Sequence, residues 1–465
     1  MKTIICYLDK DKGRDVEIVL PVTYALEKYF DCQIIFSFIW DIYLIRRVKP
    51  FGVLLPNTKG HHMYFEIAKY CYQSGIKVLA LESEGNFRTD GSFYYWGYNH
   101  EHFFYQDHVT CWSRRTMDYV KSIANSKQID KIVLTGGTGF DRYIICSFKD
   151  RQGFLEKYNK SKYEKIIGYA GWAFGKMYSA HKDIANSHIF PNDKNKRFQW
   201  IEKQRLLVKD GLENLIKSNP DKLFIFKRHP KESFESDIHE GPNEMNELLE
   251  YENVLYFKNE ENIHDLINVS DLWLGFETTT CLEAWLMDKT TILYNPEEDF
   301  PRNNIHIGSP KAKTPEELVN WVDEFFTTGK LGLFQSEQLK KNRQFLIGDA
   351  IGFGDGLNHI RAVYYFSKSL NQETLEVRPK RNWRHLRLYY LMHLGKYFYN
   401  KWVFSKLPFF RKTIYVFETM YLKDLASRKM GYYQDLDKFY SRKKLDSLLK
   451  KDYWDDELTE QLSLI

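Results

Sequence analysis

The fold is decided near the amino terminus, where Thr3-Ile4-Ile5-Cys6-Tyr7-Leu8 opens a series of short apolar runs separated by helical patterns. The apolar runs lack strict alternation of apolar and polar residues, which is typical of parallel strands covered on both faces. We therefore expect a Rossmann-like domain over residues 1–150. Its further strands are predicted at Gln33–Phe38, Val53-Leu54-Leu55-Pro56-Asn57, Ile76–Leu81 and Lys131–Thr135, and its helices at Val16–Tyr29, Asp41–Arg47 and His62–Ser74.

A second series of the same kind begins at Lys165-Ile166-Ile167-Gly168-Tyr169-Ala170 and predicts another Rossmann-like domain over residues 163–345. Two such domains in tandem leave a cleft at the carboxyl ends of their strands, where open α/β folds bind ligands. The expected fold class is α/β with two doubly wound domains facing a cleft. The predicted strands are Leu223–Lys227, Val254–Phe257, Leu272–Gly275 and Thr290–Tyr294, and the predicted helices are Arg197–Ser218, Ile263–Asn268, Thr279–Met287 and Thr314–Phe326.

The composition fits a globular protein, since 43% of the 465 residues are hydrophobic and 28% are charged. The apolar runs are far shorter than the roughly 20 residues needed to cross a bilayer, and the first strand reaches Asp9 too soon for a secretory signal. We expect a cytoplasmic protein. The six cysteines form no Cys-x-x-Cys pair, so they predict reduced core thiols, and no metal site or cofactor is expected.

The net charge of +5 is distributed unevenly along the chain. Residues 378–430 contain 13 Lys and Arg against two acids, a net charge of +11, so the other residues together carry −6. The same segment contains 13 aromatic residues and belongs to a predicted helical extension, residues 346–465. Two interpretations remain open: the segment binds an anionic membrane surface at the inner face of the cytoplasmic membrane, or it packs its rings on the body. No nucleic-acid-binding motif accompanies the cations.

Chemically useful residues follow two predicted strands of the second domain. Lys227-Arg228-His229-Pro230 places two cations and an imidazole at a strand's carboxyl end, where they suit a phosphate, and Pro230 fixes the turn. Thr278-Thr279-Thr280 places three hydroxyls at a helix start, and capping needs only one. The alternatives are a solvated loop and ordinary capping. Gly171, at the end of the domain's first strand, allows close backbone approach to a ligand.

Two acids follow a strand of the first domain, in Glu82-Ser83-Glu84-Gly85. A carboxylate over the cleft could act as a general base or as a nucleophile. Glu82 and Glu84 both remain candidates, and two exposed loop acids are the alternative.

The order of these motifs resembles that of bacterial surface-carbohydrate and capsule-biosynthesis glycosyltransferases of GT-B fold, the group that includes Kdo, sialyl- and polysialyltransferases. The resemblance covers residues 1–345 and includes Leu54-Leu55-Pro56-Asn57, Leu134–Asp141 and Glu283-Ala284-Trp285 leading to Tyr294-Asn295-Pro296. It implies that His229 and Thr278–Thr280 hold the phosphate of a CMP-activated sugar, without a metal, and that Glu84 is catalytic. The acidic pair usual before the glycine appears here as Ser83-Glu84, which leaves Glu82 as a substitute.

The resemblance implies an enzyme that moves a 2-keto acid sugar, Kdo or a sialic-acid-like nonulosonate, from CMP to a glycan or glycolipid acceptor of the cell surface. Retention and inversion of configuration are both open, because base and nucleophile are both carboxylates. Alternatives are a transferase of the same fold that uses a CDP-polyol or a UDP-sugar, and a non-catalytic glycan-assembly protein.

Overall fold

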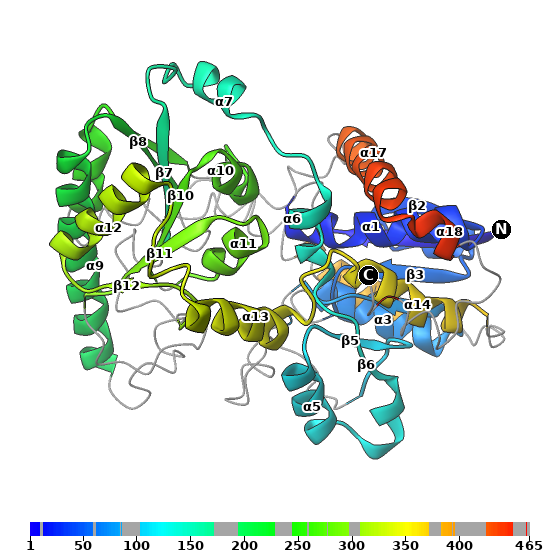
Figure 1. The fold of residues 1–465 in the computed structure, drawn as a ribbon. Coiled ribbons are helices and arrows are strands. Elements are labelled where there is room, and N and C mark those ends of the chain that lie inside the picture. Colours follow the sequence, from blue (N-terminus) through cyan, green and yellow to red (C-terminus); the bar gives the residue numbers. More distant parts are fainter. Residues whose placement is uncertain are drawn as a thin grey trace. The chain divides into compact units, whose positions relative to one another are not determined.

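The computed structural model describes residues 1–9, 13–58, 62–83, 85, 103–171, 194–227, 244–257, 260–276, 278–296, 307–371, 383–392, 394–395, 425–449 and 462. The chain forms two compact units, which we call unit 1 (Met1–Cys146 with Gly348–Ile465) and unit 2 (Ser147–Ile347) (Figure 1). Each is a Rossmann-like α/β unit built on a parallel sheet, so the predicted fold class is confirmed.

Unit 1 contains a four-stranded parallel sheet in the order β2-β1-β3-β4. All seven elements expected over residues 3–81 are present, with bounds shifted by one or two residues at most ends. A separate parallel pair, β5 (Val109–Cys111) and β6 (Ile132–Leu134), follows, with α5 (Arg114–Ile123) and α6 (Arg142–Ile145). The elements of the first series are β1 (Lys2–Leu8), α1 (Arg14–Tyr29), β2 (Cys32–Phe38), α2 (Tyr43–Val48), β3 (Gly52–Leu55), α3 (His62–Gln73) and β4 (Lys77–Ala80).

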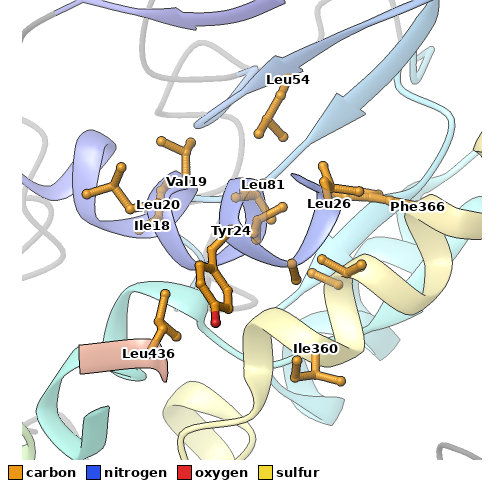
Figure 2. Close-up of a cluster of buried hydrophobic side chains, with 14 of the residues drawn as sticks. Ile18, Val19, Leu20, Tyr24, Leu26, Leu54, Leu81, Ile360, Phe366 and Leu436 are labelled. Carbon is orange, nitrogen blue, oxygen red and sulfur yellow. The ribbon is translucent and has the colours of Figure 1, made fainter. Parts of the chain in front are cut away.

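Alternate residues of the unit 1 strands enter two different cores, as the two-residue period of a strand requires. Ile4, Cys6 and Leu8 of β1 point into the core that contains α1, whereas Ile5 and Tyr7 point into the core that contains α2 and α3. Figure 2 shows the first of these cores, with side chains of α1 meeting Leu54 and Leu81 on one side and Ile360, Phe366 and Leu436 on the other. Both faces of this sheet are therefore buried.

The carboxyl-terminal helices complete the α1 core of unit 1. These helices are α14 (Asn358–Leu370), α17 (Leu425–Lys443) and α18 (Leu445–Leu449), and most of their apolar residues are buried there. Polar contacts join them to α1: Tyr24 donates to Asp437, Tyr29 donates to Asp446, and Lys28 lies 3.2 Å and 3.0 Å from these two carboxylates. Residues 348–465 thus group with the first unit, which differs from the separate extension expected over 346–465.

Unit 2 contains a six-stranded parallel sheet in the order β12-β11-β10-β7-β8-β9. Thr314 caps α12 by accepting a hydrogen bond from the Glu317 N–H at 3.2 Å, as the Thr-Pro-Glu-Glu start predicts. The strands are β7 (Lys165–Gly171), β8 (Lys222–Lys227), β9 (Val254–Phe257), β10 (Leu272–Phe276), β11 (Thr290–Tyr294) and β12 (Lys311–Ala312); the helices are α7 (Arg151–Lys157), α9 (Lys194–Ser218), α10 (Ile263–Val269), α11 (Thr280–Leu286) and α12 (Pro315–Thr328), and α13 (Glu337–Ile351) leads back to unit 1.

The six cysteines are free thiols, and all except Cys146 are buried. In the described part of the chain, no helix combines the length and the apolar character needed to cross a bilayer.

Candidate functional site

The strand order of unit 2 singles out one place on its sheet. The chain runs outward from β7 through β8 to β9 in one direction and from β10 through β11 to β12 in the other, so the order reverses between the neighbours β7 and β10. Open α/β sheets bind ligands beyond the carboxyl ends of their strands at such a reversal. The register pairs Phe276 of β10 with Gly171 of β7, and Ala170 of β7 with Lys227 of β8.

Most of the described residues predicted to bind phosphate lie at this edge. Gly171 and Lys227 end adjacent strands, and Thr278–Thr280 follow β10 directly. Arg228, His229 and Pro230 follow Lys227 in the sequence but lie outside the described residues, as does Glu84. Their assignment remains a prediction.

The three threonines have different roles in the local structure. Thr278 Oγ1 accepts a hydrogen bond from the Thr280 N–H at 3.2 Å, and its hydroxyl donates to Thr280 Oγ1 at 3.1 Å. Thr280 Oγ1 also accepts from Trp273 Nε1 at 2.9 Å. Thr279 occupies the N-cap position of α11, yet its side chain makes no capping bond and is exposed. Because α11 has only seven residues, the hydroxyls rather than the helix end are the donors that this turn offers.

Packing around β10 fixes the threonine turn. A Cβ at Gly275 would lie 2.8 Å from Cys281 Sγ and 2.9 Å from the Thr278 methyl group, so only glycine permits the turn to fold back over the strand. Burial raises the pKa of Cys281 to about 12, which makes this thiol a packing residue rather than a nucleophile. Trp273, fully buried in β10, was missed by the sequence analysis because its indole donor is identified only by the contact with Thr280.

A neighbouring side chain explains why position 171 is a glycine. A Cβ at this position would lie 2.2 Å from the Tyr169 hydroxyl, two residues back in β7. The close approach that requires glycine here is therefore that of a tyrosine side chain.

Asn295 is a residue of this edge to which the sequence analysis gave no role. It follows β11, the neighbour of β10, and its backbone N–H donates to Ala312 O at 2.9 Å. Its side chain is fully buried, and among the described residues neither Nδ2 nor Oδ1 has a hydrogen-bond partner. Buried polar groups in native proteins are nearly always paired, so an amide of this kind indicates a site where a ligand or water supplies the partner.

A second polar cluster lies at the carboxyl edge of the unit 1 sheet, where the strand order reverses between β1 and β3. Asn57, which follows β3, donates through Nδ2 to Ser83 Oγ at 2.9 Å and to Asp15 Oδ2 at 3.5 Å. Arg14, at the start of α1, donates to the Ser83 carbonyl at 3.3 Å. The structure thus brings the Leu54–Asn57 and Glu82–Gly85 motifs together, and it adds Arg14 and Asp15, which the sequence analysis did not select.

The Glu82–Gly85 turn is held by side chains that follow β5. Trp112 Nε1 donates to the Glu82 carbonyl at 2.8 Å, and Thr116 donates to the Gly85 carbonyl at 3.1 Å. A Cβ at Gly85 would lie 2.5 Å from the Trp112 ring, which explains the glycine. Glu82 is 4% exposed.

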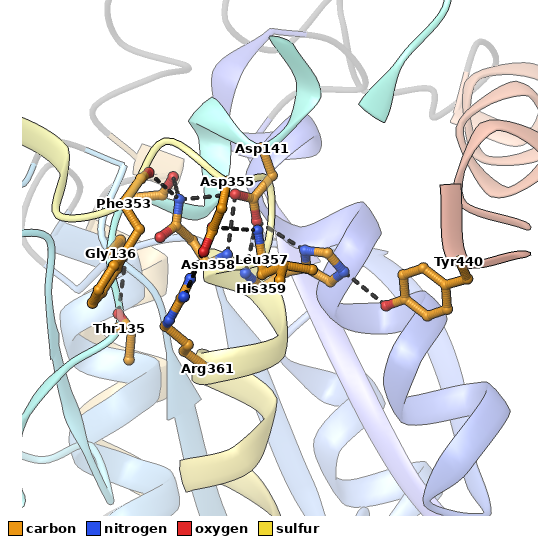
Figure 3. Close-up of polar contacts among 11 residues, drawn as sticks. Thr135, Gly136, Asp141, Phe353, Asp355, Leu357, Asn358, His359, Arg361 and Tyr440 are labelled. Atoms are coloured by element: carbon orange, nitrogen blue, oxygen red, sulfur yellow. Dashed lines mark hydrogen bonds and ion pairs between the residues drawn. The ribbon is translucent and has the colours of Figure 1, made fainter. Parts of the chain in front are cut away.

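A buried network anchors the Leu134–Asp141 motif to α14 and α17 (Figure 3). Asp141 accepts from the backbone N–H groups of Asn358 and His359, at 3.1 Å and 2.7 Å, and from Asn358 Nδ2 at 2.8 Å. His359 contacts Asp141 through Nδ1 at 2.8 Å and Tyr440 through Nε2 at 2.7 Å. Burial raises the pKa of Tyr440, so its hydroxyl stays protonated beside His359 Nε2.

The same network accounts for Gly136, whose φ is +79°. A Cβ there would lie 1.8 Å from Asn358 Oδ1. Gly136 therefore permits packing against the amino end of α14.

No family model matches the chain, and no curated protein matches it. Solved structures do match. The chain is 14% identical to Staphylococcus aureus MnaA in a structure with UDP, with a TM-score of 0.50 over 82% of this chain and 100% of that one. A Listeria monocytogenes protein described as a putative UDP-N-acetylglucosamine 2-epimerase gives 12% identity and a TM-score of 0.51 over 81% and 99%. Another UDP-N-acetylglucosamine 2-epimerase gives 13% and 0.51 over 82% and 99%.

These matches confirm the fold at the level of a GT-B-like pair of Rossmann-type units. They overturn the CMP-activated donor and, with it, the predicted transfer of a Kdo-like or sialic-acid-like sugar, because two of the similar proteins are described as UDP-N-acetylglucosamine 2-epimerases and the third is bound to UDP. The physical reason is that a strand-end acid, a basic turn and a threonine cluster describe a phosphate site. They do not distinguish uracil from cytosine or one phosphate from two.

Proposed function

We propose that this chain is an enzyme that binds a UDP-activated sugar at the carboxyl edge of the unit 2 sheet and breaks the bond between the sugar and UDP. The observation that carries the proposal is the convergence of Lys227, Thr278–Thr280 and the orphaned amide of Asn295 beyond neighbouring strands at the point where the strand order reverses. The full-length match of UDP-sugar epimerases to this fold supports it.

The chemistry of the donor set suits a nucleoside diphosphate. A diphosphate needs several donors, and the Lys227 ammonium with the exposed Thr279 hydroxyl can supply them from different strands. Glu283, 5% exposed in the first turn of α11, is a carboxylate of the kind that accepts hydrogen bonds from ribose hydroxyls. Asn295 offers both a donor and an acceptor to the same ligand.

In this proposal UDP departs as an anion, and Lys227 and the threonine hydroxyls stabilise the negative charge that develops on its β-phosphate. Arg228 and His229 would add to that stabilisation from the following turn. An acid of the Glu82–Gly85 motif would act as the base of the reaction, and Glu82 and Glu84 both remain candidates.

Two reactions share this step. In glycosyl transfer, an acceptor hydroxyl takes the sugar. The second candidate is 2-epimerisation, which is favoured by the two similar structures that are described as UDP-N-acetylglucosamine 2-epimerases. Incubation with UDP-N-acetylglucosamine separates the two: epimerisation yields a second UDP-N-acetylhexosamine without an acceptor, whereas transfer releases UDP only when an acceptor is present.

Isothermal titration of the full-length protein with UDP, CDP and CMP tests the nucleotide assignment. UDP should bind more tightly than CDP or CMP. Thr279→Val should weaken UDP binding roughly 10- to 150-fold, the loss of one hydroxyl bond to a charged group, without changing the melting temperature. Thr327→Val, an exposed threonine at the end of α12, is the matched control. Equal binding of all three nucleotides, or none, would overturn the proposal.

A further inference from the structure

Residues 383–392 are helical and dock on unit 1 by one side. Trp383 and Leu386 are buried in the core that contains α2 and α3. The Trp383 ring lies 5.4 Å from Tyr43 and 5.5 Å from Tyr70, and the Arg46 guanidinium lies 5.2 Å above it. This helical segment is therefore fixed against α2 and α3.

The opposite side of the segment exposes large apolar side chains. Leu388, Leu391 and Met392 are 58%, 44% and 64% exposed, and helical periodicity places them together, away from Trp383 and Leu386. Isolated exposed apolar residues are common, but three on one turn and a half of helix form a patch that marks an interaction site.

Cations lie on the same helical segment as this patch and on α2, which packs against the other side of the segment. Arg384 and Arg387 are exposed on the same segment, and Arg46, Arg47 and Lys49 are exposed on the adjoining α2. Two acids lie beside them and both are engaged: Asp41 accepts from Arg47 at 3.0 Å, and Glu66 lies 3.3 Å from His385. In sequence, residues 378–417 contain ten Lys and Arg and no acid.

We infer that the surface made by the outward side of residues 383–392 and the cations of α2, here called the basic apolar surface, binds an anionic lipid bilayer. Leu388, Leu391 and Met392 would enter the boundary between headgroups and acyl chains, and the cations would lie at the level of the anionic headgroups. The positive charge of this surface favours a membrane over a second copy of this chain. A second copy would bring the same positive charge to the contact, whereas an anionic membrane is complementary.

Sedimentation of the full-length protein with phosphatidylcholine vesicles that contain phosphatidylglycerol, against vesicles of phosphatidylcholine alone, tests this inference. Truncation is unsuitable, because α17 and α18 belong to the core of unit 1. The Leu388→Glu/Met392→Glu variant should reduce binding to the level seen with neutral vesicles. Arg384→Gln/Arg387→Gln should lower the partition coefficient roughly 10- to 30-fold, since each cation near an anionic surface contributes about 1 kcal/mol.

The controls match these changes in exposure and charge. Phe345→Gln alters an apolar residue of α13 that is 60% exposed, and Lys127→Gln/Lys330→Gln removes two exposed cations elsewhere; both should bind vesicles like the wild type. Failure of the wild type to bind anionic vesicles, or unchanged binding by the two surface variants, would overturn the inference. Self-association that is lost in Leu388→Glu/Met392→Glu, without vesicle binding, would assign the surface to a second copy instead. UDP binding by each variant should be normal, which keeps this test separate from the proposed function.

Discussion

Replacing the buried, unpaired amide of Asn295 by alanine should affect stability and ligand binding in opposite directions. A buried polar group without a partner costs about 1–3 kcal/mol, and among the described residues both Asn295 side-chain atoms lack one. The smaller alanine leaves a cavity of roughly 25 Å³, which at about 24 cal/mol per Å³ costs about 0.6 kcal/mol. Without ligand, Asn295→Ala should therefore be about as stable as the wild type, or more stable by up to about 2 kcal/mol.

In the presence of UDP, Asn295→Ala should instead be less stable than the wild type if Asn295 binds the nucleotide. Removing an amide that pairs with ligand leaves a ligand group unpaired and should cost at least about 1.4 kcal/mol, a tenfold loss of affinity. Urea unfolding with and without UDP measures both effects on one sample, because the stabilisation of the native state by a ligand grows with the logarithm of its affinity. The stabilisation by UDP should be smaller in Asn295→Ala than in the wild type.

Asn253 offers a matched control in the same unit. It is also buried, but its Nδ2 donates to the carbonyls of Asn219 and Lys222 at 3.2 Å and 3.1 Å. Asn253→Ala should lower the free energy of unfolding by about 1–3 kcal/mol. If Asn295→Ala is destabilised to the same extent, or if it binds UDP as tightly as the wild type, the assignment of its amide to the ligand is refuted.

Three further changes have expected outcomes. Thr280→Val should lower the free energy of unfolding by about 1–3 kcal/mol, as measured in urea, because it leaves the buried indole N–H of Trp273 unpaired. Asp141→Asn should lower the free energy of unfolding by about 3–5 kcal/mol, visible as a fall in melting temperature, because an amide nitrogen would face the His359 donors. A loss below about 1 kcal/mol would contradict the network. Burial lowers the pKa of His108 to about 4, below its value in the unfolded chain. The contribution of this residue to stability is therefore complete above pH 6.5 and is lost as the pH falls towards 4. In urea unfolding, the wild type should lose about 2 kcal/mol more than His108→Gln between pH 7 and pH 5.

The sequence predicted the elements of both sheets well, because short buried strands and amphipathic helices are local patterns. The strand β5 was missed, since three residues, Val109–Cys111, give too short a pattern. The grouping of α14 and α17 with unit 1 could not be predicted either, because it depends on contacts such as Tyr24 with Asp437, more than 400 positions apart.

The candidate phosphate site at the carboxyl edge of the unit 2 sheet was predicted in part. Lys227 and Thr278–Thr280 follow strands, and the rule that ligands bind at strand ends identifies them from sequence. The roles of Asn295 and Trp273 depend on burial and on single contacts, which no sequence pattern contains. The motifs could not identify the nucleotide base, because they describe phosphate chemistry alone.

The division of the chain has a consequence for the order in which the protein is completed during synthesis. Unit 2 is continuous in sequence, whereas the α1 core of unit 1 waits for Leu357–Leu370 and Leu425–Leu449, which leave the ribosome after unit 2. Domains generally fold as units as they emerge. Unit 2 can therefore reach its native state while the first 146 residues still expose the apolar face of α1 that α14 and α17 later cover. The α1 segment, rather than the unit that follows it, is therefore the part of this protein that exposes apolar surface for longest during synthesis.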